Sequence, residues 1–147
     1  MISCWRWLLP LLCLVLSHQP VQAQSGSMRI EDFVTRVARY WAGSDVGSIV
    51  DLIPADGTLL LDTGEGTEPA NSRHAAAALR ALFSDYDSVD ARPLRITVTS
   101  VAPQTGFSEL AWTYRSRGAP GQQARSIYLA VAVEGGAWKI TELRLMP

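Results

Sequence analysis

The segment at 138–145, Trp-Lys-Ile-Thr-Glu-Leu-Arg-Leu, decides the fold. Large apolar side chains stand first at Trp138 and Ile140, and the alternation then resumes out of phase at Leu143. Side chains in a strand repeat every two residues, so the phase changes only where one residue is bulged out. We therefore predict a β-bulge at Thr141–Glu142. Because bulges bend and twist strands, we also predict a curved sheet.

Three more strands precede this segment, and each has alternating apolar side chains. They are predicted at 94–99, 110–114 and 127–133, and Gly135-Gly136 supplies a tight hairpin before the last strand. The four strands form an antiparallel meander. The side chains expected to face inward are Leu94, Ile96, Val98, Leu110, Trp112, Tyr114, Ile127, Leu129, Val131, Trp138, Ile140, Leu143 and Leu145.

The part of the chain before the meander is mainly helical. Apolar spacing, a cap at Ser27 and stop signals predict helices at 28–42, 46–53 and 72–85, a strand at 58–61 and a glycine-rich turn region at 62–69. The order is α-α-β-α-β-β-β-β, an α+β chain. The apolar faces are all buried if the curved sheet wraps around the three helices as a cone.

Residues 1–23 have the pattern of a signal peptide. Arg6 gives a positive start, the apolar run at 8–16 is too short to span a bilayer, and small side chains precede a cleavage point after Ala23. An interfacial or re-entrant anchor is the alternative. We expect a secreted or periplasmic protein with no membrane attachment after cleavage, since Leu12 does not suit a lipoprotein site.

After cleavage, a polar stretch at 24–27 leads into a single domain at 28–147. Both cysteines leave with the leader, so no disulfide or thiolate is expected. Removing Arg6 from the 13 basic residues leaves 12, against 14 acidic ones. This balance gives no electrostatic basis for binding nucleic acid. We expect no cofactor and no metal, since His74 is then the one remaining histidine.

The element order and the Trp138-Lys139-Ile140 start of the last strand resemble the nuclear transport factor 2-like superfamily of α+β cone folds. The resemblance covers about residues 28–146. Within it, Gly64-Glu65-Gly66, the Leu82-Phe83 pair and the segment at 138–145 are most similar to a secreted bacterial family, domain of unknown function 4783. The superfamily includes isomerases, dehydratases, epoxide hydrolases and non-catalytic binding or dimerisation modules. The resemblance therefore implies a fold without choosing an activity.

Enzymes of this fold place an acid–base side chain inside the cone. The inward set contains no carboxylate and no histidine, and Tyr114 is its one titratable member. Tyr40, Asp56 and Asp62 could act from the rim, which keeps a small-molecule isomerase or lyase as an alternative function.

Leu61-Asp62-Thr63-Gly64 resembles the active-site motif of aspartic proteases, in which two such aspartates share a proton. Glu65 stands where those enzymes usually carry Ala or Ser, and a helix follows where a β flap belongs. We interpret Asp62 as the end of a strand and the start of a turn. The acidic cluster of Asp62, Glu65 and Glu68 lacks the register of a calcium loop, and we interpret His74 as a solvated side chain.

We therefore predict a secreted, non-catalytic binding or accessory protein, with an isomerase or lyase and a structural subunit of an envelope complex as alternatives. No catalytic residue is assigned. Large rings are expected to meet inside the cone, where they either form a solid core or line an apolar pocket for a small apolar ligand. These residues are Phe33, Tyr40, Trp41, Trp112, Tyr114 and Trp138.

The opposite face of the sheet is expected to be flat. Ala111, Ala130 and Ala132 point outward there, beside Thr97, Thr99 and Tyr128. Small side chains let a second sheet approach closely, and dimers of this kind are frequent in the resembled superfamily. We predict a homodimer through this face.

Overall fold

The two-phase segment at 138–145 lies in β6 (Ala137–Met146) of the computed structural model, which describes residues 28–55 and 57–147. Ala130 on the neighbouring strand pairs with Glu142, whereas Val131 pairs with Ile140. Thr141 is therefore the extra residue, and the predicted bulge is confirmed.

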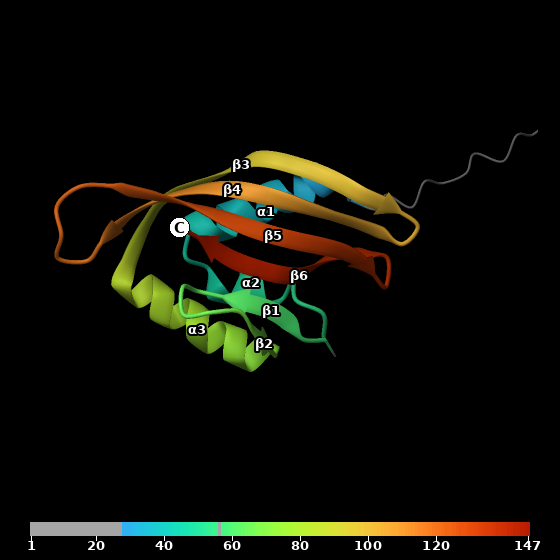
Figure 1. Cartoon of the computed structure of the whole chain (residues 1–147), viewed down its shortest axis with the longest axis horizontal. Coiled ribbons are helices and arrows are strands. Elements are labelled where there is room, and N and C mark those ends of the chain that lie inside the picture. Colours follow the sequence, from blue (N-terminus) through green and yellow to red (C-terminus); the bar gives the residue numbers. More distant parts are fainter. Residues whose placement is uncertain (1–27, 56) are drawn as a thin grey trace, which may run out of the picture.

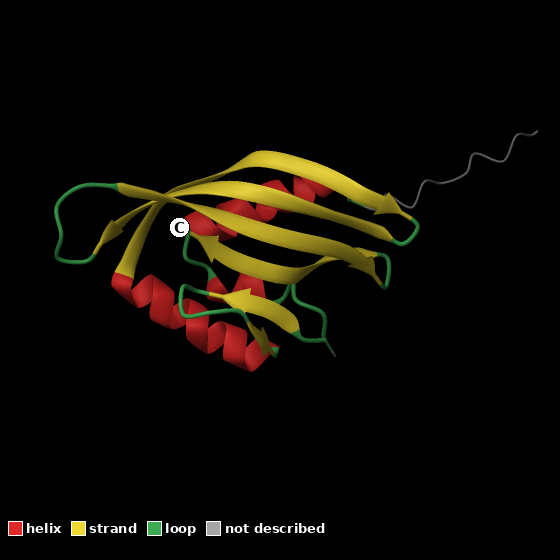
Figure 2. Ribbon diagram, in the orientation of Figure 1, coloured by secondary structure: helices red, strands yellow, loops and turns green. Residues whose placement is uncertain are grey.

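One curved sheet of six strands, in the order β2-β1-β6-β5-β4-β3, forms a single layer (Figures 1 and 2). The strand β1 runs parallel to β6, and the other neighbouring pairs are antiparallel. The strand bounds besides those of β6 are β1 Leu59–Asp62, β2 Glu68–Ala70, β3 Tyr86–Val101, β4 Gln104–Ser116 and β5 Gln123–Glu134. The predicted α+β cone is confirmed, with β2 as a strand that the sequence pattern did not reveal.

Three helices provide the other layer. The helix α1 (Ile30–Ala42) packs behind β3 and β4 (Figure 1). The short α2 (Val46–Val50) is capped by Asp45, whose carboxylate accepts a hydrogen bond from the Ser48 backbone N–H at 3.1 Å. The third helix, α3 (Ser72–Asp85), is capped by Asn71, whose side chain accepts from the His74 backbone N–H at 2.9 Å. None of the helices described here is long and apolar enough to cross a membrane.

The inward side chains predicted for β4, β5 and β6 are buried, but the prediction for β3 was partly wrong. Leu94 is 54% exposed and Val98 is 51% exposed. Leu94 has no partner in the register with β4, because Pro93 pairs with Leu110 and the next pair is Arg95 with Glu109. Similar shifts occur near Val89 and Thr99. This edge strand therefore changes phase three times where a simple alternation was expected.

The predicted signal peptide at 1–23 and the polar stretch at 24–27 lie outside the described residues, as does Asp56. Cleavage and secretion therefore stay predictions.

Candidate functional site

The six residues predicted to line a cone pocket fall into three places. Phe33 and Trp138 face one another with ring centroids 6.5 Å apart. Trp41, Trp112 and Tyr114 form a second group, in which the Trp112 and Tyr114 rings stack at 4.4 Å. Tyr40 stands apart on α1 and is half-buried against the core.

The second group also takes in Phe83 at the end of α3 and Tyr86 at the start of β3. Phe83 lies edge-on to both Trp41 and Trp112, and Tyr86 lies edge-on to both Trp112 and Tyr114. The rings thus fill the space between α1, α3 and β4. None of the six predicted residues lines either of the two hollows described below. The pocket lining stays a prediction.

The polar tips of three of these rings are hydrogen-bonded to groups at the edge of the core. The Trp112 Nε1–H donates to Ser88 Oγ at 2.9 Å, the Trp138 Nε1–H to the Met28 carbonyl at 2.7 Å, and the Tyr114 hydroxyl to Gln123 Oε1 at 3.1 Å. Trp41 Nε1 has no hydrogen-bond partner among the described residues. Its ring packs edge-on against two aromatic neighbours, a setting in which an N–H can rest over a π face.

The core of the described residues is mostly apolar, with the Tyr114 phenol as a buried titratable group. Among the described residues, Ser108 is the one polar or charged residue that is fully buried, and its hydroxyl donates to the Arg95 carbonyl at 2.8 Å. No carboxylate or imidazole of the described chain lies in the core.

A surface groove of about 630 Å³ lies between α3 and the loop that joins β1 to β2. The helix supplies one continuous face, and the loop supplies the facing wall. The residues that line the groove are Leu61, Thr63, Glu65, Gly66, Thr67, Glu68, His74, Ala77, Ala78, Ala81, Leu82, Asp85 and Tyr86.

The groove exists because α3 presents small side chains on this face. This face carries Ala77 and Ala78, with Ala81 one turn further along, and their small side chains leave room above the helix. On the opposite face, Leu79 and Phe83 anchor the helix in the core. Tyr86 lies at the point where the helix passes into β3.

The facing loop is held in shape by Asp62. Its carboxylate accepts hydrogen bonds from the backbone N–H of Gly64 at 2.8 Å and of Gly66 at 3.3 Å, and from the Thr67 hydroxyl at 3.3 Å. Gly64 and Gly66 have φ of 110° and 120°, which glycine adopts without strain. The bond from Gly64 is the main reason that the pKa of Asp62 is lowered. Asp62 is thus engaged in a turn, as predicted.

The charges that line the groove are mainly negative. Glu65, Glu68 and Asp85 are acidic, His74 Nε2 lies 3.2 Å from Glu68 Oε1, and no lysine or arginine is among the lining residues. Within the described chain, neither Glu65 nor Asp85 forms an ion pair.

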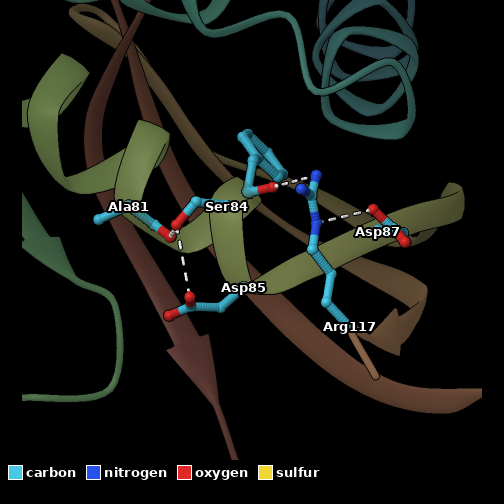
Figure 3. Close-up of polar contacts among 6 residues, drawn as sticks. Ala81, Ser84, Asp85, Asp87 and Arg117 are labelled. Atoms are coloured by element: carbon cyan, nitrogen blue, oxygen red, sulfur yellow. Dashed lines mark hydrogen bonds and ion pairs between the residues drawn. The ribbon is translucent and has the colours of Figure 1, made fainter. Parts of the chain in front are cut away.

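Arg117 closes the carboxyl end of α3 from outside the groove (Figure 3). Its guanidinium donates to the Phe83 carbonyl at 3.3 Å and pairs with Asp87 at 3.0 Å. The Asp85 carboxylate points the other way, toward the Ser84 hydroxyl at 3.4 Å. Arg117 therefore stabilises the helix end without an ion pair to the Asp85 carboxylate, while its backbone N–H donates to the Asp85 carbonyl at 3.0 Å.

A second hollow of about 300 Å³ lies across the loop from the groove. Asp62, Gly64 and Gly66 line one wall, and Arg125 and the chain end from Leu145 to Pro147 line the other. No group of three or more metal-ligating side chains is placed to hold an ion in the described parts of the chain.

Sequence reasoning missed the groove. It grouped Glu65 and Glu68 with Asp62 as an acidic cluster and treated His74 as a separate solvated side chain, although Glu68 and His74 pair and Glu65, Glu68 and His74 line one hollow. One available signal was the run of alanines at 75–78 and Ala81, because alanine on the exposed face of an amphipathic helix leaves a furrow that larger polar side chains would fill.

No family model and no curated protein matches the sequence. Solved structures do match in fold. A hypothetical protein of ketosteroid isomerase-like fold from Catenulispora acidiphila, in complex with trimethylamine, has a TM-score of 0.62 and 18% identity over 79% of this chain and 85% of that one. A ketosteroid isomerase-like protein from Erwinia carotovora atroseptica has a TM-score of 0.59 and 14% identity, with 79% and 92% covered.

A DUF4783 family protein from Bacteroides uniformis has a TM-score of 0.59 and 11% identity, with 74% of this chain and 91% of that one covered. At these identities the likeness is one of fold. The predicted resemblance is confirmed at that level: the chain has the nuclear transport factor 2-like cone fold, which it shares with ketosteroid isomerase-like proteins and with proteins of the DUF4783 family.

Proposed function

We propose that this protein is a secreted, non-catalytic binding or accessory protein that holds a small ligand in the groove beside α3. The observation that carries the proposal is the composition of the cone interior. Acid–base catalysis needs a proton-transferring group at the reacting atom. The buried core of the described chain has rings and aliphatic side chains in that place, while the groove is open to solvent and combines an apolar floor with a polar rim.

The comparisons support a capacity to hold small molecules without naming one for this chain. The Catenulispora acidiphila protein of the same fold is in complex with trimethylamine. A groove of about 630 Å³ lies within the range of sizes typical of small-molecule sites.

The test is to fill the groove. Ala81→Trp places a large ring on the exposed alanine face of α3, and Thr35→Trp places the same ring at an exposed position of α1 outside the groove. Native mass spectrometry of protein from its producing organism should detect a bound small molecule in the wild type and in the Thr35→Trp control, and none in Ala81→Trp. Equal occupancy in all three proteins would contradict the proposal.

Secretion belongs to the same proposal and rests on the leader pattern at 1–23. Mass spectrometry of exported protein should give a chain that starts at Gln24. A mature product that retains Met1 would contradict secretion.

One observation favours the isomerase or lyase as a second candidate. The His74 imidazole lies 3.2 Å from a Glu68 carboxylate oxygen at the groove, and Tyr86 lines the same hollow. A carboxylate that orients an imidazole is a recurring acid–base arrangement. With the ligand in hand, proton exchange from D2O into it, followed by NMR and lost in His74→Gln, would establish this candidate. An unlabelled ligand would dismiss it.

A further inference from the structure

We infer that the groove is built for an extended aliphatic diamine or polyamine. The inference rests on the proposed function, because it names the ligand class of the same groove.

The groove is long and its floor is apolar. Its helical wall runs from His74 to Asp85, eleven residues apart, which is about 16 Å along a helix axis. Between these ends the helix contributes Ala77, Ala78, Ala81 and Leu82. A strip of methyl groups favours an extended methylene chain, because apolar CH₂ groups gain free energy when they leave water for an apolar surface.

Both ends of this strip carry negative charge. Glu68 lies at the His74 end, Asp85 lies at the other end, and Glu65 faces the helix from the loop. The one basic side chain of the lining is His74. Arg117 is engaged with Phe83 and Asp87 (Figure 3), and Arg125 lines the second hollow across the loop. Arg73 and Arg80 are also on α3, but both are exposed and neither lines the groove.

The groups at the ends suit ammonium ions in particular. An ammonium has three donors and no acceptor, and the groove offers carboxylate oxygens together with the hydroxyls of Thr63 and Thr67. Tyr86 adds a ring at the Asp85 end, and two aromatic neighbours hold it edge-on. A cation over such a ring is attracted by the ring quadrupole. An anionic ligand would instead meet three carboxylates.

The experiment compares three eight-carbon compounds by isothermal titration calorimetry at low salt. They are diaminooctane, octylamine and octanediol, which carry their amino or hydroxyl groups at the chain ends. Glu65→Gln with Asp85→Asn removes charge from the groove. Glu134→Gln is the matched control, because Glu134 is exposed on β5 outside the lining. Ala81→Trp blocks the groove itself.

We expect affinity to fall from the diamine through the monoamine to the diol. We expect the double variant to weaken diamine binding about 4- to 25-fold, at roughly two- to fivefold per exposed carboxylate. The Glu134→Gln control should leave it unchanged, and Ala81→Trp should abolish it.

Three results would overturn the inference. The first is equal binding of diol and diamine that Ala81→Trp abolishes, which leaves the proposed groove function standing. The second is that none of the three octane derivatives binds, while the ligand recovered from the source organism is still lost in Ala81→Trp. This result too leaves the groove function standing. The third is diamine binding that Glu134→Gln weakens as much as the double variant and that Ala81→Trp leaves intact, which means general surface attraction. The proposed function is contradicted as well if the ligand recovered from the source organism also stays bound in Ala81→Trp.

Discussion

Trp41 of α1 meets Trp112 of β4 edge to face, with ring centroids 5.6 Å apart and ring planes at 84°. Both side chains are fully buried. Edge-to-face geometry places the positive ring edge against the negative face, and the pair gains about 0.5–1.5 kcal/mol beyond the burial of the two rings. This pair joins the first helix to the middle of the sheet, so the packing favours a filled cone over an open one at these positions.

Trp112→Ala should therefore be strongly destabilising. The substitution deletes a fully buried ring that contacts Trp41, Phe83, Tyr86 and Tyr114, and we expect a loss of about 3–5 kcal/mol in the free energy of unfolding. Urea denaturation measures it. Tyr40→Ala is the control, and its loss should be smaller because Tyr40 is half-buried.

The same variant tests the predicted apolar pocket. If the rings line an open pocket, Trp112→Ala should cost little stability and should reduce the binding of an apolar fluorescent probe. A large stability loss, with no probe binding by the wild type, would exclude a pocket formed by these rings.

Gly106→Ala should also destabilise the protein. A Cβ at Gly106 would lie 2.6 Å from the Thr97 carbonyl oxygen and 2.6 Å from Ile30 Cδ1, and the backbone oxygen cannot move without disturbing the β3–β4 pairing. We expect a cost of about 1–3 kcal/mol. Thermal unfolding should show a lower Tm.

Gly47→Ala, unlike Gly106→Ala, should not destabilise the protein. Gly47 lies in α2, and a Cβ there meets nothing closer than 3.7 Å. Alanine is favoured over glycine in helices by about 0.5–1 kcal/mol, so Tm should stay the same or rise. A drop in Tm equal to that of Gly106→Ala would mean that close packing at Gly106 is not the cause.

Asp62 should stabilise the β1–β2 loop in a pH-dependent way. Its pKa in the folded protein is lowered from the ordinary 3.8, chiefly by the hydrogen bond from the Gly64 N–H. A lowered folded pKa means that the stabilisation is fully present above the unfolded pKa and is lost as pH falls through the folded pKa. Asp62→Asn should cost less than about 1 kcal/mol at pH 7, because the carboxylate is largely solvated, and less than that at about pH 3, which lies below the ordinary pKa of 3.8. Urea denaturation at the two pH values measures both.

The same variant checks the prediction that Asp62 is not catalytic. Pepstatin-sensitive proteolysis at acid pH that disappears in Asp62→Asn would contradict it.

Periodicity predicted the strands at 110–114, 127–133 and 138–145 in the correct phase because each lies inside the sheet with one face on the core. It failed on β3, an edge strand in which Leu94 has no partner across the ladder. An edge strand is paired on one side, so its register can shift without breaking a second ladder. The β1–β6 pair was missed because a parallel contact joins segments about eighty residues apart, and local pattern carries no information on it.

The groove could not be predicted from the local sequence pattern for a similar reason. The alanine face of α3 is visible in the sequence, but the loop opposite it is placed by the β1–β2 pair and by the hydrogen bonds to Asp62. The predicted ring cluster was easier to find, since large apolar side chains on inward phases have nowhere else to pack. Its division into a Phe33–Trp138 pair and a larger group around Trp112 depends on where α1 crosses the sheet.

The outer face of the sheet is where we predict a homodimer. Ala111, Ala130 and Ala132 are half-buried there, and Phe107 stacks on Tyr128 with ring centroids 5.9 Å apart. The Arg144 guanidinium lies 4.8 Å from the centre of the Tyr128 ring. This face therefore combines small side chains with a fixed aromatic pair, a composition that suits close approach of a second sheet.

Light scattering should give the mass of a dimer, and Ala130→Glu should give a monomer. Ala130 pairs with Phe107 and Glu142 across the ladder, so a glutamate there adds a charge beside an existing carboxylate at the centre of the face. Its neighbours Leu129 and Val131 point into the core, so the fold should persist and Tm should change little beyond the loss of association. Ala119→Glu, in the exposed turn between β4 and β5, is the control and should remain dimeric. A wild-type protein that stays monomeric at high concentration would rule out this interface.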